Sequence, residues 1–217
     1  MIKAVLFDLD GTLIDTNELI FNSFDYALRT VLNLNPSKDE ITQLFGKPLR
    51  GSLAQFNEEK ADELVTTYRR YNEERHDTMC KPFEGVKELL DGLKDRGIKL
   101  GIVTSKRKVL AERGLVLGGL LEYFDVFFTP ESTKNHKPHG EPAEKACESL
   151  NVKPEEAIMV GDSNFDLLCG KNAGTKTCGV TYTALPISVL EEVKPDYFID
   201  KAIELLEIVD KENEAVA

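Results

Sequence analysis

The sequence predicts an α/β protein in which helices cover both faces of a parallel sheet, with a block of helices inserted after the first strand. Short apolar runs alternate with helical patterns along most of the chain. This alternation is typical of a doubly wound parallel sheet, because parallel strands need a crossover connection, usually a helix. One long interval, between Thr12 and Pro82, contains only helical patterns and predicts the inserted block.

The expected strands are short and mostly apolar, as strands with helices on both sides are. The first strand covers Ala4 to Phe7, and helical patterns such as Val86 to Arg96 and Phe165 to Asn172 lie between later strands. The further expected strands are Lys99 to Thr104, Val126 to Thr129, Ala157 to Val160, Thr177 to Val180 and Tyr197 to Ile199.

The inserted block reads as several amphipathic helices. Apolar residues recur at helical spacing in its first part, and Ser37 with Glu40 three residues later forms a capping box that starts another helix. We expect residues 15–81 to form a small helical cap domain, and residues 1–14 and 82–217 to form the core. A domain inserted at that point would cover the carboxyl edge of the sheet, where ligands bind in such folds.

The composition excludes several classes of protein. Hydrophobic residues make up 41% of the 217 residues, which is enough for a folded core. No apolar run approaches the ~20 residues that span a bilayer, and a strand begins almost directly after Met1, so we expect neither a membrane segment nor a signal peptide. The net charge of −11 argues against a nucleic acid as partner.

Cysteine usage bears on the compartment. The four cysteines form no Cys-x-x-Cys pair and no spacing typical of a metal site. Without a secretion signal, reduced thiols in the cytoplasm are the expectation. The expected partner is a small substrate, and the assembly is a monomer or a homodimer, between which the sequence does not decide.

The end of the first strand carries the strongest functional signal. Asp8 and Asp10 follow the apolar run and lie two residues apart, so they would share one face of a continuing strand. Two carboxylates that close repel each other unless a cation or a shared proton intervenes. The alternative interpretation is a plain strand end with an Asp-Gly turn at Gly11.

Polar groups also follow two later elements. Thr104 and Ser105 end a strand, and a hydroxyl followed by turn amides suits a phosphate, although Ser105 could equally cap a helix. Lys137 precedes Pro138 in a polar loop, where a lysine is more often simply solvated.

A second acidic strand end lies near the carboxyl third of the chain. Asp162 follows a buried strand, and Asp166 comes four residues later at a helix start, where it could merely favour the helix dipole. Asp162 opposite the Asp8 and Asp10 pair is a candidate site for a hard cation. Mg²⁺ prefers carboxylates, waters and a phosphate oxygen, so it is the expected cofactor.

These groups together suit phosphoryl transfer. A carboxylate can attack phosphorus to give an aspartyl-phosphate, provided that a cation and a lysine neutralise the opposing charges. A second carboxylate can protonate the leaving oxygen and later deprotonate water. The net negative charge of the chain makes such neutralisation necessary for an anionic substrate.

Four ordered segments resemble the motifs of the haloacid dehalogenase superfamily of aspartyl-phosphate hydrolases. They are Asp8-Leu9-Asp10-Gly11-Thr12, Thr104-Ser105, Lys137-Pro138 and Gly161-Asp162 with Asp166. The resemblance covers essentially the whole chain and implies a Rossmann-like core with a helical cap after the first motif.

The resemblance also implies roles for individual residues. Asp8 would be nucleophile and metal ligand, and Asp10 the general acid/base that binds metal through its backbone carbonyl. Lys137 would neutralise charge, Asp162 would hold Mg²⁺, and Asp166 would support the metal site. The remaining residues implied around the phosphate are Thr104, Ser105, Gly11 and Thr12.

Within the superfamily, the segment after Asp15 and the segment Phe45 to Leu49 look most like the pyrophosphatase branch and its neighbour, phosphoglycolate phosphatase. We therefore expect a phosphohydrolase acting on pyrophosphate or a small phosphorylated metabolite. A sugar phosphomutase of the β-phosphoglucomutase type and a non-catalytic phospho-ligand binder stay open as alternatives. Lys47 and Arg50 are the expected cap residues that grip a distal anionic group.

Overall fold

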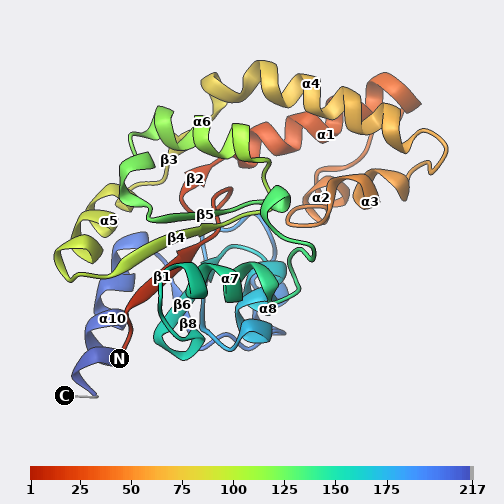
Figure 1. Cartoon of the computed structure of the whole chain (residues 1–217). Helices are drawn as coiled ribbons and strands as arrows, with labels where there is room; N and C mark the ends of the chain where they lie inside the picture. The colour runs from red at the N-terminus through yellow and green to blue at the C-terminus, as the bar shows by residue number, and fades with distance from the viewer. Residues whose placement is uncertain (216–217) are drawn as a thin grey trace.

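A six-stranded parallel sheet forms the centre of the computed structural model, which describes residues 1–215 (Figure 1). The strand order is β5-β4-β1-β6-β7-β8, so the first strand lies in the middle and the chain leaves it in both directions. A crevice forms where the order reverses beside such a central strand. The strands are β1 (Ala4–Phe7), β4 (Lys99–Val103), β5 (Val126–Phe128), β6 (Ala157–Gly161), β7 (Lys176–Val180) and β8 (Tyr197–Ile199).

The register of the central strands places their polar successors side by side. Phe7 of β1 pairs with Ile102 of β4 on one side and with Val160 of β6 on the other. All three strands are parallel, so the residues that follow them emerge at the same edge of the sheet. The functional loops predicted after these strands are therefore neighbours.

Helices cover both faces of the sheet, as expected from the alternating pattern. Val5 and Phe7 face one apolar cluster with α5, α6 and α10, whereas Ala4 and Leu6 face another with α7 and α8. The helices are α5 (Val86–Asp95), α6 (Lys108–Gly118), α7 (Glu141–Ser149), α8 (Asn164–Ala173), α9 (Ile187–Glu191) and α10 (Leu205–Glu214).

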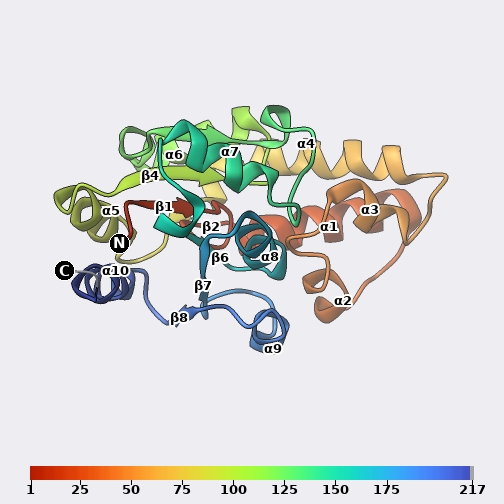
Figure 2. The same cartoon turned by 60° about the horizontal axis from the view of Figure 1, so that its bottom comes forward.

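The four helices within residues 17–79 form a separate layer beyond one end of the sheet (Figures 1 and 2). The two long helices α1 and α4 pack along each other, and Phe24, Leu28 and Leu64 contribute to their shared apolar cluster. The expected capping box at Ser37 and Glu40 is present at the start of α2. The helices are α1 (Asn17–Leu32), α2 (Lys38–Thr42), α3 (Leu49–Ala54) and α4 (Ala61–Met79).

A short two-stranded ribbon joins this helical layer to the sheet. Strand β2 (Ile14–Asp15) pairs antiparallel with β3 (Lys81–Pro82). The sequence predicted no strand between Thr12 and Pro82, and this part of the expectation is wrong. A strand of two residues is too short to show a periodic pattern in the sequence. The pairing arises only because the two segments that connect the helices to the core lie side by side.

The described residues contain no helix that is both long and apolar enough to cross a bilayer.

Candidate active site

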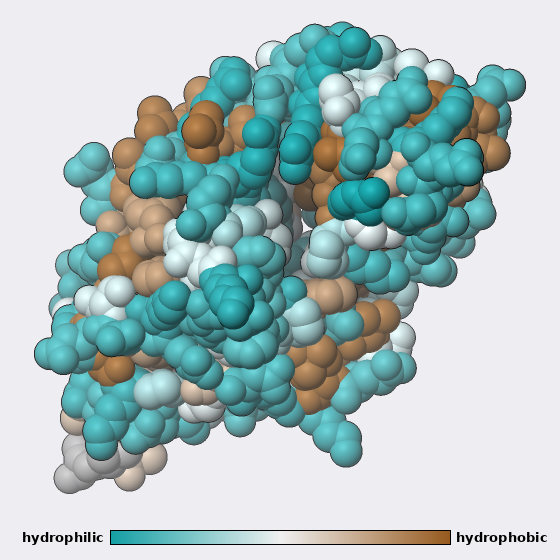
Figure 3. All heavy atoms as spheres, turned by 45° about the vertical axis from the view of Figure 1, so that its right-hand side comes forward, coloured by the Kyte–Doolittle hydropathy of each residue, from teal (hydrophilic) through white to brown (hydrophobic). Residues whose placement is uncertain are grey.

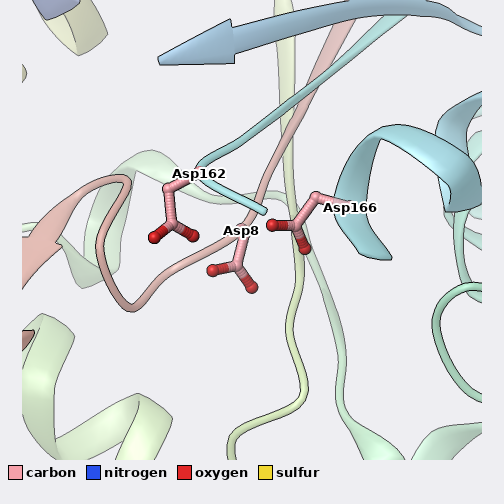
Figure 4. Close-up of side chains that lie close together, drawn as sticks. All are labelled: Asp8, Asp162 and Asp166. Carbon is pink, nitrogen blue, oxygen red and sulfur yellow. The ribbon is translucent and has the colours of Figure 1, made fainter. Parts of the chain in front are cut away.

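Three buried aspartates meet at the carboxyl edge of the sheet (Figure 4). Asp8 follows β1, Asp162 follows β6, and Asp166 lies in the first turn of α8. One carboxylate oxygen from each lies within 4.8 Å of the others. The parallel register explains this meeting for Asp8 and Asp162, and the helix that starts directly after β6 brings Asp166 to the same place.

Lys137 lies among these carboxylates and pairs with two of them. Its ammonium is 2.6 Å from Asp8 Oδ1, it donates a hydrogen bond of 3.0 Å to the carbonyl of Val103, and it also pairs with Asp166 Oδ1. Only 4% of the side chain is exposed. Burial alone would lower the pKa of Lys137, but the carboxylates of Asp166 and Asp8 raise it above its usual value, so the ammonium stays charged.

Asp166 is held by its own helix start. Its second carboxylate oxygen accepts hydrogen bonds from the Ser163 backbone N–H at 3.0 Å and the Ser163 hydroxyl at 2.7 Å. The first oxygen is occupied by Lys137. Asp166 therefore fixes the lysine that reaches Asp8, in addition to capping α8.

The cluster carries an excess of negative charge. Burial is the main cause that raises the pKa of Asp8 to about 7. The carboxylate of Asp166 raises it further, whereas Lys137 opposes the shift. Burial, Asp166 and Asp8 raise the pKa of Asp162 well above its usual value. Three carboxylates face one ammonium and offer only hard oxygen donors, which is the donor set of a divalent magnesium-like cation. The residues present therefore fit a divalent metal.

Gly11 makes room for Asp162. A Cβ atom at Gly11 would lie 2.3 Å from Asp162 Oδ2, and the residue has a φ of +78°. Both features require glycine. The backbone N–H of Gly11 donates to the Ile14 carbonyl and that of Thr12 to the Leu9 carbonyl.

The structure offers no support for the expected contact of Gly11 and Thr12 with phosphate, which stays a prediction. Their amides are already used in the turn, and neither residue lines the cavity described below. The hydroxyl of Thr12 is buried and has no hydrogen-bond partner.

Asp10 pairs with a lysine that the sequence analysis missed. Lys106 Nζ lies 2.7 Å from Asp10 Oδ1, while the Lys106 backbone N–H donates to the Thr104 hydroxyl at 3.1 Å. The basic run from Lys106 to Lys108, directly after Thr104 and Ser105, was the available signal.

A cavity of about 230 Å³ opens above these residues, between the sheet edge and the helical layer. Figure 3 shows the hollow between the two parts of the molecule. Its floor contains Asp8, Asp10, Thr104, Ser105, Lys137, Asp162 and Asp166, and its other walls include Thr16, Asn17, Phe24, Phe45, Lys47, Tyr68, Arg69, Asn72, Lys106 and Arg107.

Lys47 and Arg50, the two cap residues expected at the site, lie in different surroundings in the structure. Lys47 lines the cavity, and its neighbour Gly46 (φ +73°) comes so near α8 that a Cβ would lie 2.8 Å from Ser163 Cβ. Arg50 does not line the cavity, because it pairs with Glu58 at 3.1 Å and Asp62 at 3.0 Å on the surface. Arg50 therefore lies outside the cavity lining, and its expected contact with the substrate stays a prediction.

Arg69, Asn72 and Tyr68 are cavity residues that the sequence did not indicate. They lie on α4, inside a highly charged segment where no motif distinguishes a cavity residue from a solvated one.

Known proteins resemble this chain over nearly its full length. A family model described as haloacid dehalogenase-like hydrolase matches residues 5–180. A Clostridium perfringens protein, provisionally named pyrophosphatase PpaX, is 54% identical over 98% of this chain and 100% of its own length. Pyrophosphatase PpaX of Bacillus cereus is 44% identical, covering 98% of both chains.

Solved structures agree with these relatives. A haloacid dehalogenase-like hydrolase from Streptococcus pneumoniae superimposes with a TM-score of 0.87 at 28% identity, covering 96% of this chain and 98% of the other. A predicted phosphoglycolate phosphatase from Haemophilus somnus gives 0.84 at 26% identity, with the same coverage. The chain therefore belongs to the haloacid dehalogenase-like hydrolases and, like the phosphatases among these relatives, is a hydrolytic enzyme.

Proposed function

We propose that this hydrolase is a Mg²⁺-dependent phosphohydrolase that acts through an aspartyl-phosphate on Asp8. The observation that carries the proposal is the contact between Asp8 and Lys137 at the floor of a cavity. A buried ammonium beside a carboxylate nucleophile offsets the repulsion that an incoming phosphoryl group would meet.

The surrounding residues supply the other parts of such a reaction. Asp8 would attack phosphorus, and Asp10 would give a proton to the leaving oxygen and later take one from water. Thr104 and Ser105, which line the cavity, would hold the phosphoryl oxygens. Asp166 positions Lys137 through their ion pair.

Asp8, Asp162 and the backbone carbonyl of Asp10 would hold the Mg²⁺ ion. When bound, the ion would supply the positive charge that the acidic cluster lacks. The raised pKa values of Asp8 and Asp162 support this assignment, because they report carboxylates that need a cation to stay ionised together.

We also propose that residues 15–81 act as a cap over a core formed by residues 1–14 and 82–217. The cap contributes Lys47, Arg69 and other cavity walls, so substrate must enter between the two parts. Opening would bend the chain near Leu13 to Thr16 and near Lys81 to Phe83, where the β2–β3 ribbon makes the connection.

The substrate is pyrophosphate or a small phosphorylated metabolite such as phosphoglycolate. A cavity of about 230 Å³ suits a compact ligand, and its cationic side chains suit a second anionic group. Those side chains are Lys47, Arg69, Lys106 and Arg107. The names of the pyrophosphatase relatives point in the same direction. We place the activity in the cytoplasm, which the four free thiols among the described residues support.

Phosphate release tests this function directly. The purified protein is incubated with pyrophosphate, phosphoglycolate, glycerol phosphate and an aryl phosphate, each with Mg²⁺ or with excess chelator. We expect Mg²⁺-dependent phosphate release, fastest on pyrophosphate or phosphoglycolate. Turnover of a sugar phosphate only in the presence of a sugar bisphosphate would instead indicate a phosphomutase, and binding without turnover would indicate a phospho-ligand binder.

A further inference from the structure

Lys106 is a nearly buried cation to which the bond-making and bond-breaking steps described so far give no part. Only 8% of its side chain is exposed, and its ammonium lies 2.7 Å from Asp10 Oδ1. The residue follows β4 in the loop before α6 and lines the cavity. Burying a lysine costs free energy unless a partner compensates, and Asp10 is that partner.

The two lysines of the site, Lys137 and the nearly buried Lys106, contact different carboxylates. Lys137 contacts Asp8, the proposed nucleophile, whereas Lys106 contacts Asp10, the proposed proton donor. A proton donor must stand beside the oxygen that departs. An ammonium within 2.7 Å of that donor therefore stands beside the leaving group, and Lys137 stands beside the attacking oxygen.

We infer that Lys106 is a catalytic residue that stabilises a negatively charged leaving group. The inference rests on the proposed function and deepens it, because it assigns the site to phosphoanhydrides in preference to esters of neutral alcohols. Lys106 touches the departing phosphate and is a different group from the residues that hold the transferred one.

The step balances as follows for pyrophosphate. An oxygen of Asp8 forms a bond to one phosphorus while the bridging P–O bond breaks, and its electron pair stays on the bridging oxygen. Asp10 gives that oxygen a proton, so the second half departs as inorganic phosphate. Water then attacks the aspartyl-phosphate, Asp10 takes a proton from the water, and a second inorganic phosphate leaves.

The leaving group decides how much Lys106 contributes. An alcohol is neutral once Asp10 has protonated it, so it gains little from an ammonium. A departing phosphate keeps negative charge on its other oxygens throughout, and that charge interacts favourably with the ammonium of Lys106 beside it. Removing one such preorganised group typically costs about 10²–10³-fold in kcat.

The test compares Lys106→Gln with the wild type on two substrates, pyrophosphate and glycerol phosphate, in Mg²⁺. We expect kcat on pyrophosphate to fall by about 10²-fold or more and kcat on glycerol phosphate by less than about tenfold. Lys106→Arg, which keeps the charge, should recover much of the loss on pyrophosphate. Lys108→Gln is the matched control, because Lys108 lies two residues away, is exposed and does not line the cavity; it should retain wild-type rates.

Two outcomes overturn the inference and are distinguishable. Equal losses on both substrates, with an unchanged melting temperature, would show that Lys106 only holds Asp10 in place. No phosphate release from either substrate by the wild-type protein would remove the proposed function, and the inference with it. Should Lys106→Gln fold poorly, Lys106→Arg decides. The ratio of kcat on pyrophosphate to kcat on glycerol phosphate should then stay near the wild-type value. A large fall of that ratio in this folded, charged variant would contradict the role.

Discussion

The floor of the cavity, at the edge of the sheet, differs in construction from its roof, by which we mean the cavity walls contributed by helices α1 to α4 and the loops between them. The floor consists of buried groups that bind one another, such as Lys137 between Asp8 and Asp166. The roof combines buried apolar walls such as Phe24 with exposed cations such as Lys47, and Arg50, 54% exposed, pairs with surface carboxylates outside the cavity. The difference teaches that the sheet fixes the relative positions of the floor residues, while the positions of the roof cations depend on how the helical layer packs on the core.

Contacts between two helices hold the roof to the core. Glu73 and Asp77 on α4 pair with Arg107 and Arg113 at α6. Between these pairs, the fully buried His76 packs against Gly114, where a Cβ would lie 3.5 Å from the ring. The two parts of the cavity are thus connected by these ion pairs, by the contact of His76 with Gly114, and by an apolar cluster that Leu167, Leu185 and Leu190 of the core share with the helical layer.

Replacing the proposed nucleophile on the floor should cause the largest loss of activity. Asp8→Asn keeps the shape of the side chain but removes the attacking carboxylate, so we expect no measurable phosphate release and an intact fold by circular dichroism. Asp91→Asn, far from the cavity on α5, is the control and should behave as wild type. Turnover of Asp8→Asn near the wild-type rate would sink the aspartyl-phosphate mechanism.

The two lysines of one loop should differ by orders of magnitude. Lys137→Ala removes the ammonium between Asp8 and Asp166 and should lower kcat by about 10²-fold or more. Lys134→Ala should change it little, because Lys134 is exposed and does not line the cavity. Steady-state phosphate release measures both, and the reverse ranking would show that the loop has been misassigned.

Metal binding should be visible in the pH dependence of stability. The unfolded chain ionises Asp8 near its ordinary pKa of 3.8, whereas the folded, metal-free protein keeps the proton until about pH 7. Stability in chelator should therefore fall as pH rises between those values. Thermal unfolding should show a larger stabilisation by Mg²⁺ at pH 8 than at pH 5, since the ion competes with protons.

Asp8→Asn again supplies the comparison for that measurement. It lacks one of the two titrating carboxylates with raised pKa, so its stability in chelator should depend less on pH than that of the wild type. The same pH dependence in both proteins would contradict the assignment.

In the roof, Lys47 and Arg50 should behave differently although they lie three residues apart. Lys47→Ala should raise KM for the preferred substrate by about tenfold, corresponding to about 1.4 kcal/mol, because Lys47 lines the cavity. Arg50→Ala should leave KM unchanged, because its partners are Glu58 and Asp62. Equal changes in both variants would place the roof contacts elsewhere.

The connection between floor and roof should give the smallest effects. Glu73→Gln and Asp77→Asn each remove one partly exposed ion pair, which is typically worth about 0–1 kcal/mol. Glu73→Gln should also alter KM, because its partner Arg107 lines the cavity and Arg113 does not. Calorimetry measures the change in stability and steady-state kinetics the change in KM. Identical KM values in the two variants would show that neither ion pair affects substrate binding.

The sequence predicted which residues meet on the floor but missed several residues that line the other walls, for physical reasons. Asp8, Thr104 and Asp162 follow apolar strands, and parallel pairing must bring such residues to one edge. Lys106 and Arg69 depend on the orientation of a loop and of a helix, which tertiary packing sets.

Hydrogen bonds and ion pairs to near neighbours explain why three further expected residues do not present free groups to the cavity. Arg50 was expected over the site, but two acidic neighbours on the roof attract it more directly. Gly11 and Thr12 looked like phosphate-binding amides, and the turn itself uses those amides. A sequence motif identifies which residues lie near a site, and only the hydrogen-bond inventory shows which of their groups are free.

The β2–β3 ribbon has a consequence for how such enzymes can diversify. Because Ile14 pairs with Pro82 and Asp15 with Lys81, the inserted helices leave and rejoin the core at adjacent points, about 5 Å apart as neighbouring strands are. For the core backbone, the whole insert therefore replaces the loop of a hairpin, because its two connections lie side by side. An entire recognition layer can be lengthened, shortened or exchanged as one cassette while the register that aligns Asp8 with its lysine stays untouched.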